Sequence, residues 1–216
     1  MEHKMRQIEI ATESDIKELY DLQLIAFESE AEMVGSRNVP ALMESYEHSC
    51  EDFKNWTTLI KRDENGKIIG AARFQQMTDY DESDSFSPAA PHFEIGRVMV
   101  APDHRNQGIA MELIGAIEEY APSHSPSHSP SHNPGHEPNL SPNHAQGQDP
   151  NNSQDNPKIK TAQAEESDNE SVFELYTCTK SYININLYEK LGYEIFKTEK
   201  GDRDLSFAYL RKTVRT

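Results

Sequence analysis

Residues 94–121 read EIGRVMVAPDHRNQGIAMELIGAIEEYA, and this stretch decides the fold. It begins inside a segment, Phe93 to Val100, that is predicted to be a strand and is ended by Pro102. From about Gly108 to Tyr120 its aliphatic residues recur at helical spacing along one face. The stretch therefore predicts a strand, a short turn and an amphipathic helix that covers a sheet.

The sequence before this stretch predicts two helices and three strands. A capping-box pattern, Thr12-Glu-Ser-Asp15, follows a short strand at 7–11 and opens a helix that runs to about Glu30. A second helix is expected from Ala41 to about Asn55. Asn65-Gly66 supplies the turn of a hairpin between strands at 57–62 and 67–77.

The sequence after residue 170 predicts a strand, a helix and two more strands, at 172–177, 181–191, 195–199 and 205–211. Antiparallel strands followed by a strand, helix and strand crossover imply a mixed sheet with helices on both faces. The predicted class is α+β, with a mixed, mostly antiparallel central sheet in one domain spanning 1–216.

A tract from Ala121 to Glu170 interrupts this domain. It holds eight of the chain's 12 prolines and no aromatic residue, and its first half repeats proline every four residues with interleaved histidines. Too little apolar surface is present to offset the entropy of ordering, so the tract is predicted to be a disordered insertion. Its histidines suggest weak binding of zinc, nickel or copper, but no rigid metal site is expected.

The composition excludes several classes of function. The net charge of −16 opposes contact with nucleic acid, and no apolar run approaches the roughly 18 to 20 residues of a membrane helix. Two cysteines are too few for a disulfide scaffold, and no signal-peptide pattern opens the chain. The protein is therefore expected to be cytoplasmic.

Chemistry is concentrated in the turn Arg105-Asn-Gln-Gly108-Ile-Ala110. Its small residues let a ligand approach the backbone, and the amides that open the next helix carry partial positive charge. Together with Arg105 they suit a pyrophosphate. The turn lacks the Gly-Lys-Ser/Thr of a P-loop and the three glycines of a dinucleotide site.

Two motifs in this order carry a family resemblance. The segment EIGRVMVAPDHRNQGIAMELIGAIEEYA, followed downstream by NLYEKLGYEIF at 186–196, resembles the GNAT acetyltransferase family. The resemblance covers nearly all of the chain outside 121–170 and implies the acyl-CoA N-acyltransferase fold, with acetyl-CoA as co-substrate. Two central strands are then expected to splay apart and admit the pantetheine arm.

The resemblance also implies site residues. Backbone groups of the central strand, aided by a bulge, would hold pantetheine; they belong to Val98, Met99 and Val100. The turn would hold the pyrophosphate, through Arg105, Asn106, Gln107, Gly108, Ile109 and Ala110. At the last of these positions alanine replaces a commoner glycine. Tyr188 matches the tyrosine that protonates the departing thiolate, a transfer its pKa permits. Asn184 lies one helical turn before Tyr188, where its amide is expected to bond pantetheine or to order a water. The family asparagine usually stands three residues further upstream, and Ser181 occupies that place here.

An amine must lose a proton before it attacks the thioester, and either a carboxylate, acting directly or through water, or solvent alone takes that proton. Glu94 is the first candidate for this general base, and Glu30 and Glu174 are runners-up. Arg97 could instead orient an acidic substrate. An acyl-enzyme on Cys178 is rejected, since direct transfer needs no nucleophile and no histidine lies near this cysteine in sequence.

The main hypothesis is an N-acetyltransferase that passes the acetyl group directly to a small-molecule amine, with a homodimer left open. A protein N-terminal or lysine acetyltransferase and a non-catalytic acyl-CoA-binding sensor are the alternatives. A histidine-tract metal binder is a third.

Overall fold

The computed structural model describes residues 8–77, 90–124, 170–201 and 205–215, all of them in one compact unit. Its seven strands are β1 (Glu9–Ile10), β2 (Thr57–Arg62), β3 (Ile68–Gln76), β4 (His92–Val100), β5 (Glu170–Cys178), β6 (Glu194–Lys200) and β7 (Ser206–Arg215). Its α-helices are α1 (Ile16–Val34), α2 (Pro40–Met43), α3 (Tyr46–Asp52), α4 (Ile109–Ser123) and α5 (Tyr182–Lys190). Two short 3-10 helices are η1 (Glu13–Asp15) and η2 (Pro102–His104).

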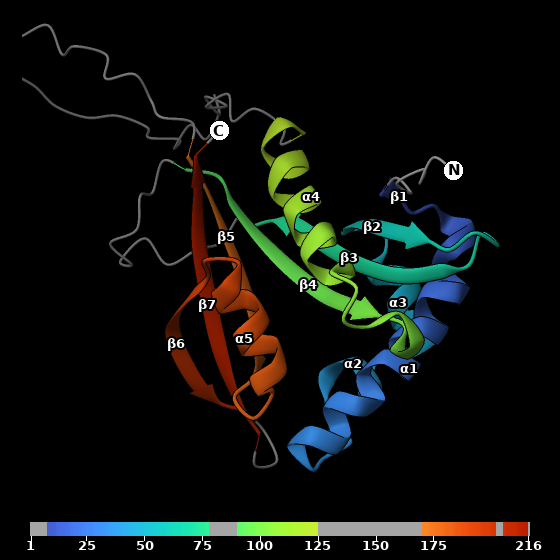
Figure 1. Cartoon of the computed structure of the whole chain (residues 1–216), viewed down its shortest axis with the longest axis horizontal. Helices are drawn as coiled ribbons and strands as arrows, with labels where there is room; N and C mark the ends of the chain where they lie inside the picture. The colour runs from blue at the N-terminus through green and yellow to red at the C-terminus, as the bar shows by residue number, and fades with distance from the viewer. Residues whose placement is uncertain (1–7, 78–89, 125–169, 202–204, 216) are drawn as a thin grey trace, which may run out of the picture. The chain divides into compact units, whose positions relative to one another are not determined.

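The strands form one mixed sheet in the order β1-β2-β3-β4-β5-β7-β6 (Figure 1). Among the described strands, β4 and β5 alone pair in parallel, and the other neighbouring pairs are antiparallel. The predicted class, α+β with a mostly antiparallel sheet, is confirmed.

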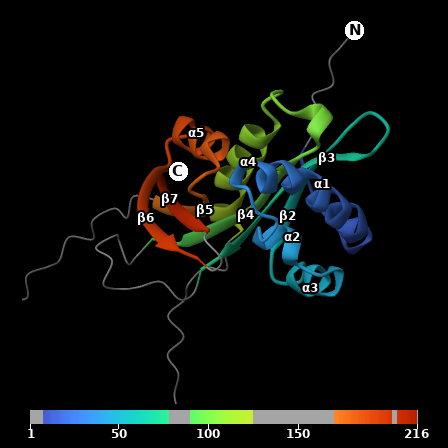
Figure 2. The same cartoon turned by 90° about the horizontal axis from the view of Figure 1, so that it is seen from below.

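Helices cover both faces of the sheet. A Cβ built on Gly70 of β3 would lie 2.5 Å from Ile109 Cγ2, which shows how closely α4 packs on this face. On the other face, Arg73 of β3 and Met99 of β4 line a small pocket together with Ile16 and Leu19 of α1. Figure 2 shows α4 and α5 on one side of the strands and α2 and α3 on the other. None of the described helices is long and apolar enough to cross a membrane.

Several predicted boundaries are wrong. The helix α1 ends at Val34 and not near Glu30, and β7 continues to Arg215 and does not end at 211. The single helix expected over 41–55 is divided into α2 and α3, because Glu44 and Ser45 between them are extended and the Ser45 hydroxyl caps α3 by accepting from the His48 amide at 3.2 Å. The helix α4 continues to Ser123, three residues into the tract predicted as an insertion, because Ala121 is buried in the core. Residues 125–169 of that tract lie outside the described residues.

Candidate active site

A β-bulge lies in the middle of β4. The register passes from Ala71↔Met99 to Arg73↔Gly96, so β4 holds one residue more than β3 between these pairs. Arg97 sits at the bulge with a φ of 49°, a left-handed value that is uncommon for a residue with a side chain. A bulge re-aims backbone groups locally, and one was expected here from the sequence.

The strands β4 and β5 separate beyond this bulge. They pair only from His92↔Val172 to Glu94↔Glu174 and then diverge, so the rest of this edge of β4 has no partner strand in the described part of the chain. Figure 1 shows the two strands as the arms of a V. The expected splay of two central strands is thus present, and it leaves backbone groups of Val98 and Val100 beside an open gap.

The turn before α4 is tight and uncapped. Asn106 and Gly108 both have positive φ, 60° and 81°, and Gly108 occupies the N-cap without a side chain to satisfy the first amides of α4. A Cβ at Gly108 would meet only Met111 Cε, at 3.7 Å. Arg105 donates from Nη2 to the Ala26 carbonyl of α1 at 2.9 Å, which anchors the turn. The helix start is therefore open to an anion.

A cavity of about 700 Å³ joins the gap to this turn. Its wall includes every residue predicted to bind the cofactor except Gln107, which is exposed: Val98, Met99, Val100, Arg105, Asn106, Gly108, Ile109, Ala110 and Asn184. Met33, Tyr182 and Ile183 add apolar surface that the sequence motifs did not identify. We call this space the larger cavity.

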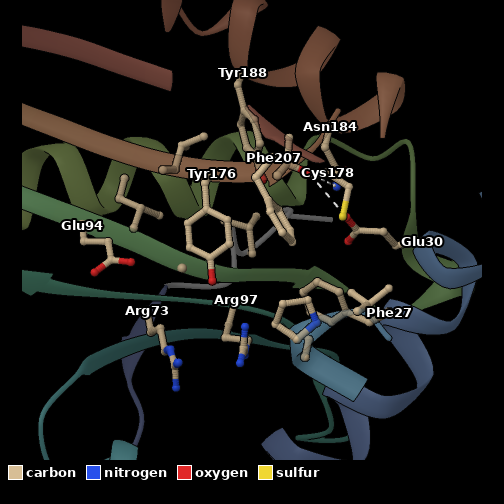
Figure 3. Close-up of a pocket in the computed structure, with 18 of the residues that line it drawn as sticks. Phe27, Glu30, Arg73, Glu94, Arg97, Tyr176, Cys178, Asn184, Tyr188 and Phe207 are labelled. Carbon is tan, nitrogen blue, oxygen red and sulfur yellow. Dashed lines mark hydrogen bonds between the residues drawn. The ribbon is translucent and has the colours of Figure 1, made fainter. Parts of the chain in front are cut away.

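A smaller cavity of about 110 Å³ lies on the other side of the β4 bulge (Figure 3). Its wall includes Glu94, whose Oε2 accepts a hydrogen bond from Gln75 Nε2 at 3.1 Å. It also includes aromatic side chains from α1, β5, β7 and the connection between α3 and β2, namely Phe27, Tyr176, Phe207 and Trp56.

The two cavities meet at five residues that line both: Phe27, Glu30, Val98, Asn184 and Tyr188. Tyr188 is 6% exposed, and its hydroxyl has no hydrogen-bond partner among the described residues. Burial, and secondarily the Glu30 carboxylate, raise the pKa of Tyr188 well above its usual value. The phenol therefore stays protonated at any ordinary pH, as a proton donor must before it acts. The close match between phenol and thiol pKa values expected from the sequence is not found, because burial of the hydroxyl disfavours the phenolate.

Glu30 is held in place at this junction. Ser181, fully buried at the start of α5, donates from its hydroxyl to Glu30 Oε1 at 2.7 Å, and Thr177 donates to the same oxygen at 3.4 Å. Asn184 Nδ2 donates to Thr177 Oγ1 at 3.4 Å, so the amide predicted to bind pantetheine has a partner within the protein. Ser181 thus orients a carboxylate at the junction of the two cavities.

Two other sequence candidates have different surroundings. Glu174 lines neither cavity, and its carboxylate accepts a hydrogen bond from Arg211 Nε at 2.8 Å. Burial opposes the ionisation of Glu174, but the nearby His92 and Arg211 outweigh this effect and lower its pKa. Cys178 lines the smaller cavity, yet burial and the nearby Glu30 charge raise the pKa of its thiol to about 12. Such a thiol is a poor nucleophile, which argues against an acyl-cysteine.

Sequence reasoning missed Arg73, which comes from the middle of β3 and lines the smaller cavity. The one signal available was a lone charged residue inside the apolar run IIGAARF. Tyr176 and Phe207 were also missed, because aromatic residues in strands are equally common in cores.

Comparison with known proteins places this site in a family context. A family model described as "Acetyltransferase (GNAT) family" matches residues 16–128. No curated protein matches the sequence.

Solved structures with the same fold include two enzymes that acetylate ribosomal-protein alanine. The one from Brucella melitensis is 16% identical, with 96% of this chain and 99% of that chain covered and a TM-score of 0.56. The Escherichia coli S18 enzyme is 12% identical, with 98% and 96% covered and a TM-score of 0.57. A phosphinothricin acetyltransferase from Sinorhizobium meliloti, solved with acetyl-CoA, is 12% identical, with 97% and 89% covered and a TM-score of 0.57. At such identities the likeness establishes the fold.

The larger cavity fits acetyl-CoA on this chain's own features. Its volume lies within the range of about 300–1,000 Å³ usual for ligand sites. The uncapped start of α4 and Arg105 offer donors for phosphate, and the open edge of β4 offers backbone groups for the pantetheine amides.

Proposed function

The chain belongs to the GNAT family of acetyltransferases, and on this premise we propose that it acetylates the amino group of a small cytoplasmic molecule. Acetyl-CoA is the co-substrate and supplies the acetyl group. The observation that carries the proposal is the meeting of a large and a small cavity at Tyr188 and Val98, beside the β4 bulge. The donor would enter through one cavity and the acceptor through the other, so transfer would be direct.

Each part of the junction has a role in this proposal. The backbone amide of Val98, re-aimed by the bulge, would hydrogen-bond the thioester carbonyl oxygen and stabilise the charge that develops there. Tyr188 would give its phenolic proton to the departing thiolate sulfur. The nitrogen–carbon bond would form as the carbon–sulfur bond breaks.

Glu94 is the proposed general base. Its carboxylate lines only the acceptor side, where it would take the proton that the amine must lose, either directly or through water. The charge of Glu30 acts on Tyr188, but the Glu30 carboxylate is engaged by Ser181 and Thr177, which favours a positioning role.

Support for a small acceptor comes from the size of the smaller cavity, which is below the usual range for ligand sites. The fold does not distinguish acceptors, since its neighbours are named for both ribosomal proteins and phosphinothricin. The two cysteines are free thiols, which suits a reducing compartment such as the cytoplasm.

The experiment compares Glu94→Gln and Glu30→Gln in steady-state assays across a panel of amines. We expect Glu94→Gln to lower kcat/KM by about 10² or more and to remove the acidic limb of the pH profile. We expect Glu30→Gln to lower it less and to keep that limb. The reverse pattern would assign the base to Glu30. If neither the wild type nor either variant released CoA with any amine of the panel, acetyl transfer to amines would be contradicted.

A further inference from the structure

Two arginine side chains from neighbouring strands line the smaller cavity. Arg73 lies on β3 and Arg97 on β4, and both side chains are largely buried, at 13% and 15% exposed. Figure 3 shows them extending in the same direction, between Glu94 at one end of the view and Glu30 at the other. A buried guanidinium is costly unless its charge and its donors are satisfied.

One carboxylate holds each arginine. Asp52 of α3 accepts from Arg73 Nη2 at 3.0 Å, and Glu44 lies 3.4 Å from Arg97 Nη2. The Arg73 guanidinium stacks on the Trp56 ring, with its central carbon 4.4 Å from the ring centroid. This contact fixes the orientation of the Arg73 side chain, and the ion pair with Asp52 balances its charge. These contacts pre-organise both groups before any acceptor arrives.

The contacts do not satisfy the arginines completely. Arg73 Nε and Arg97 Nε are both buried without a hydrogen-bond partner in the described ranges. Burial, and then the nearby charge of Arg97, lower the pKa of Arg73, so the two cations are close enough to repel each other. Two guanidinium groups of like charge, held close together beside a cavity wall, favour the binding of an anion.

The rest of the wall suits a group of opposite charge. Glu94 and Glu30 line the same cavity, and neither is paired with Arg73 or Arg97. A ligand with a cationic amino group and an anionic group a few ångströms apart would complement both sets of side chains. A simple amine would leave the arginine donors unmet.

We propose that the acceptor is a free amino acid or an amine of similar size bearing a carboxylate, and that Arg73 and Arg97 bind this carboxylate while the amino group faces Glu94 and the β4 bulge. The inference rests on the proposed function and deepens it. It makes the two arginines specificity determinants for the acceptor, with no part in binding acetyl-CoA.

The first test uses the wild-type protein with matched acceptors. Release of the CoA thiol is measured with each common amino acid, its amide and the amine that lacks the carboxyl group. We expect kcat/KM for the preferred amino acid to exceed that for its amide and its amine by at least about tenfold, or 1.4 kcal/mol. Equal or faster turnover of the amides, the simple amines or a peptide N-terminus would overturn the inference.

The second test uses variants. Arg73→Gln and Arg97→Gln should raise KM for the amino acid about tenfold or more, leave turnover of the amide nearly unchanged and leave acetyl-CoA affinity unchanged. Arg73→Lys and Arg97→Lys keep the positive charge and therefore control for misfolding caused by its loss. Their KM values for the amino acid should lie between those of the wild type and the glutamine variants. Arg215→Gln, on a side chain 76% exposed at the end of β7, is the control and should change nothing. An equal loss with both acceptors would overturn the carboxylate contact.

The outcomes separate this inference from the proposed function. Failure to bind acetyl-CoA would overturn the proposed function and the inference with it. Binding of acetyl-CoA with turnover of acceptors that lack a carboxylate would overturn only the inference.

Discussion

Substitution of Tyr188 separates catalysis from stability, with Tyr193 as its matched control. Both tyrosines are buried on the α5 side of the sheet, with ring centroids 6.3 Å apart, but only Tyr188 lines the two cavities. Tyr193 donates to Glu118 Oε1 at 2.8 Å, whereas the Tyr188 hydroxyl has no partner in the structured ranges described above. Tyr188→Phe and Tyr193→Phe should therefore have opposite effects.

The magnitudes follow from these contacts. Loss of a general acid lowers kcat by about 10²–10⁴, or about 3–5 kcal/mol, and Tyr188→Phe should show this with a free energy of unfolding changed by less than about 1 kcal/mol. Tyr193→Phe removes a hydrogen bond to a carboxylate and should cost about 2 kcal/mol, equivalent to a Tm lower by about 4–8 °C. Its kcat should stay within about twofold.

The assay is release of the CoA thiol at saturating acetyl-CoA, with thermal unfolding measured on the same samples. Because burial and the Glu30 charge raise the pKa of Tyr188 above its usual 10.0, the wild-type kcat should also show no decline from loss of this proton up to pH 10. A Tyr188→Phe variant that keeps more than about a third of the wild-type kcat would refute the role of Tyr188 as the acid.

Two further predictions concern packing and acid stability. Gly70→Ala should cost about 1–3 kcal/mol of stability and weaken acetyl-CoA binding, because its Cβ would meet Ile109 at 2.5 Å and push the start of α4 away. Gly115→Ala, whose Cβ would meet nothing within 4 Å, should stabilise the protein by about 0.5–1 kcal/mol. Denaturant melts of the two variants check the sign of each change. Glu174→Gln leaves Arg211 buried without its carboxylate and should cost about 3 kcal/mol at pH 7. Since the folded-state pKa of Glu174 is lowered from 4.5, this stabilisation is present above 4.5 and is lost as pH falls below 4.5 and through the folded-state pKa. The difference in stability between the two proteins should therefore shrink steadily below pH 4.5, and a constant difference in urea melts would refute the cause given.

Local patterns account for what the sequence predicted well. The strand at 57–62 has the predicted bounds, because an Asn-Gly turn and β-branched residues fix it without help from distant parts of the chain. The α4 turn and the Tyr188 helix follow from motifs of contiguous residues. The residues predicted to hold the cofactor, apart from Gln107, line one cavity, because they belong to these contiguous motifs.

Long-range contacts account for what the sequence did not predict. The break between α2 and α3 depends on Glu44, whose carboxylate turns inward to Gln23 of α1 and Arg97 of β4. The acceptor wall joins Arg73 to Asp52, 21 residues away, and no periodicity indicates such a pair. Candidates for the base could not be ranked from the sequence, because the hydrogen bonds that hold Glu30 come from residues about 150 positions later.

Binding of acetyl-CoA, measured by calorimetry on three proteins, tests the account most directly. Gly108→Glu places a carboxylate at the open start of α4 and a side chain at a φ of 81°. Gly66→Glu, at a φ of 83° in the β2–β3 turn with nothing within 4 Å, carries the same added charge and backbone strain away from the larger cavity. We predict saturable binding to the wild type and Gly66→Glu and at least about 100-fold weaker binding to Gly108→Glu; equal binding by all three, or none by the wild type, would contradict the proposed site.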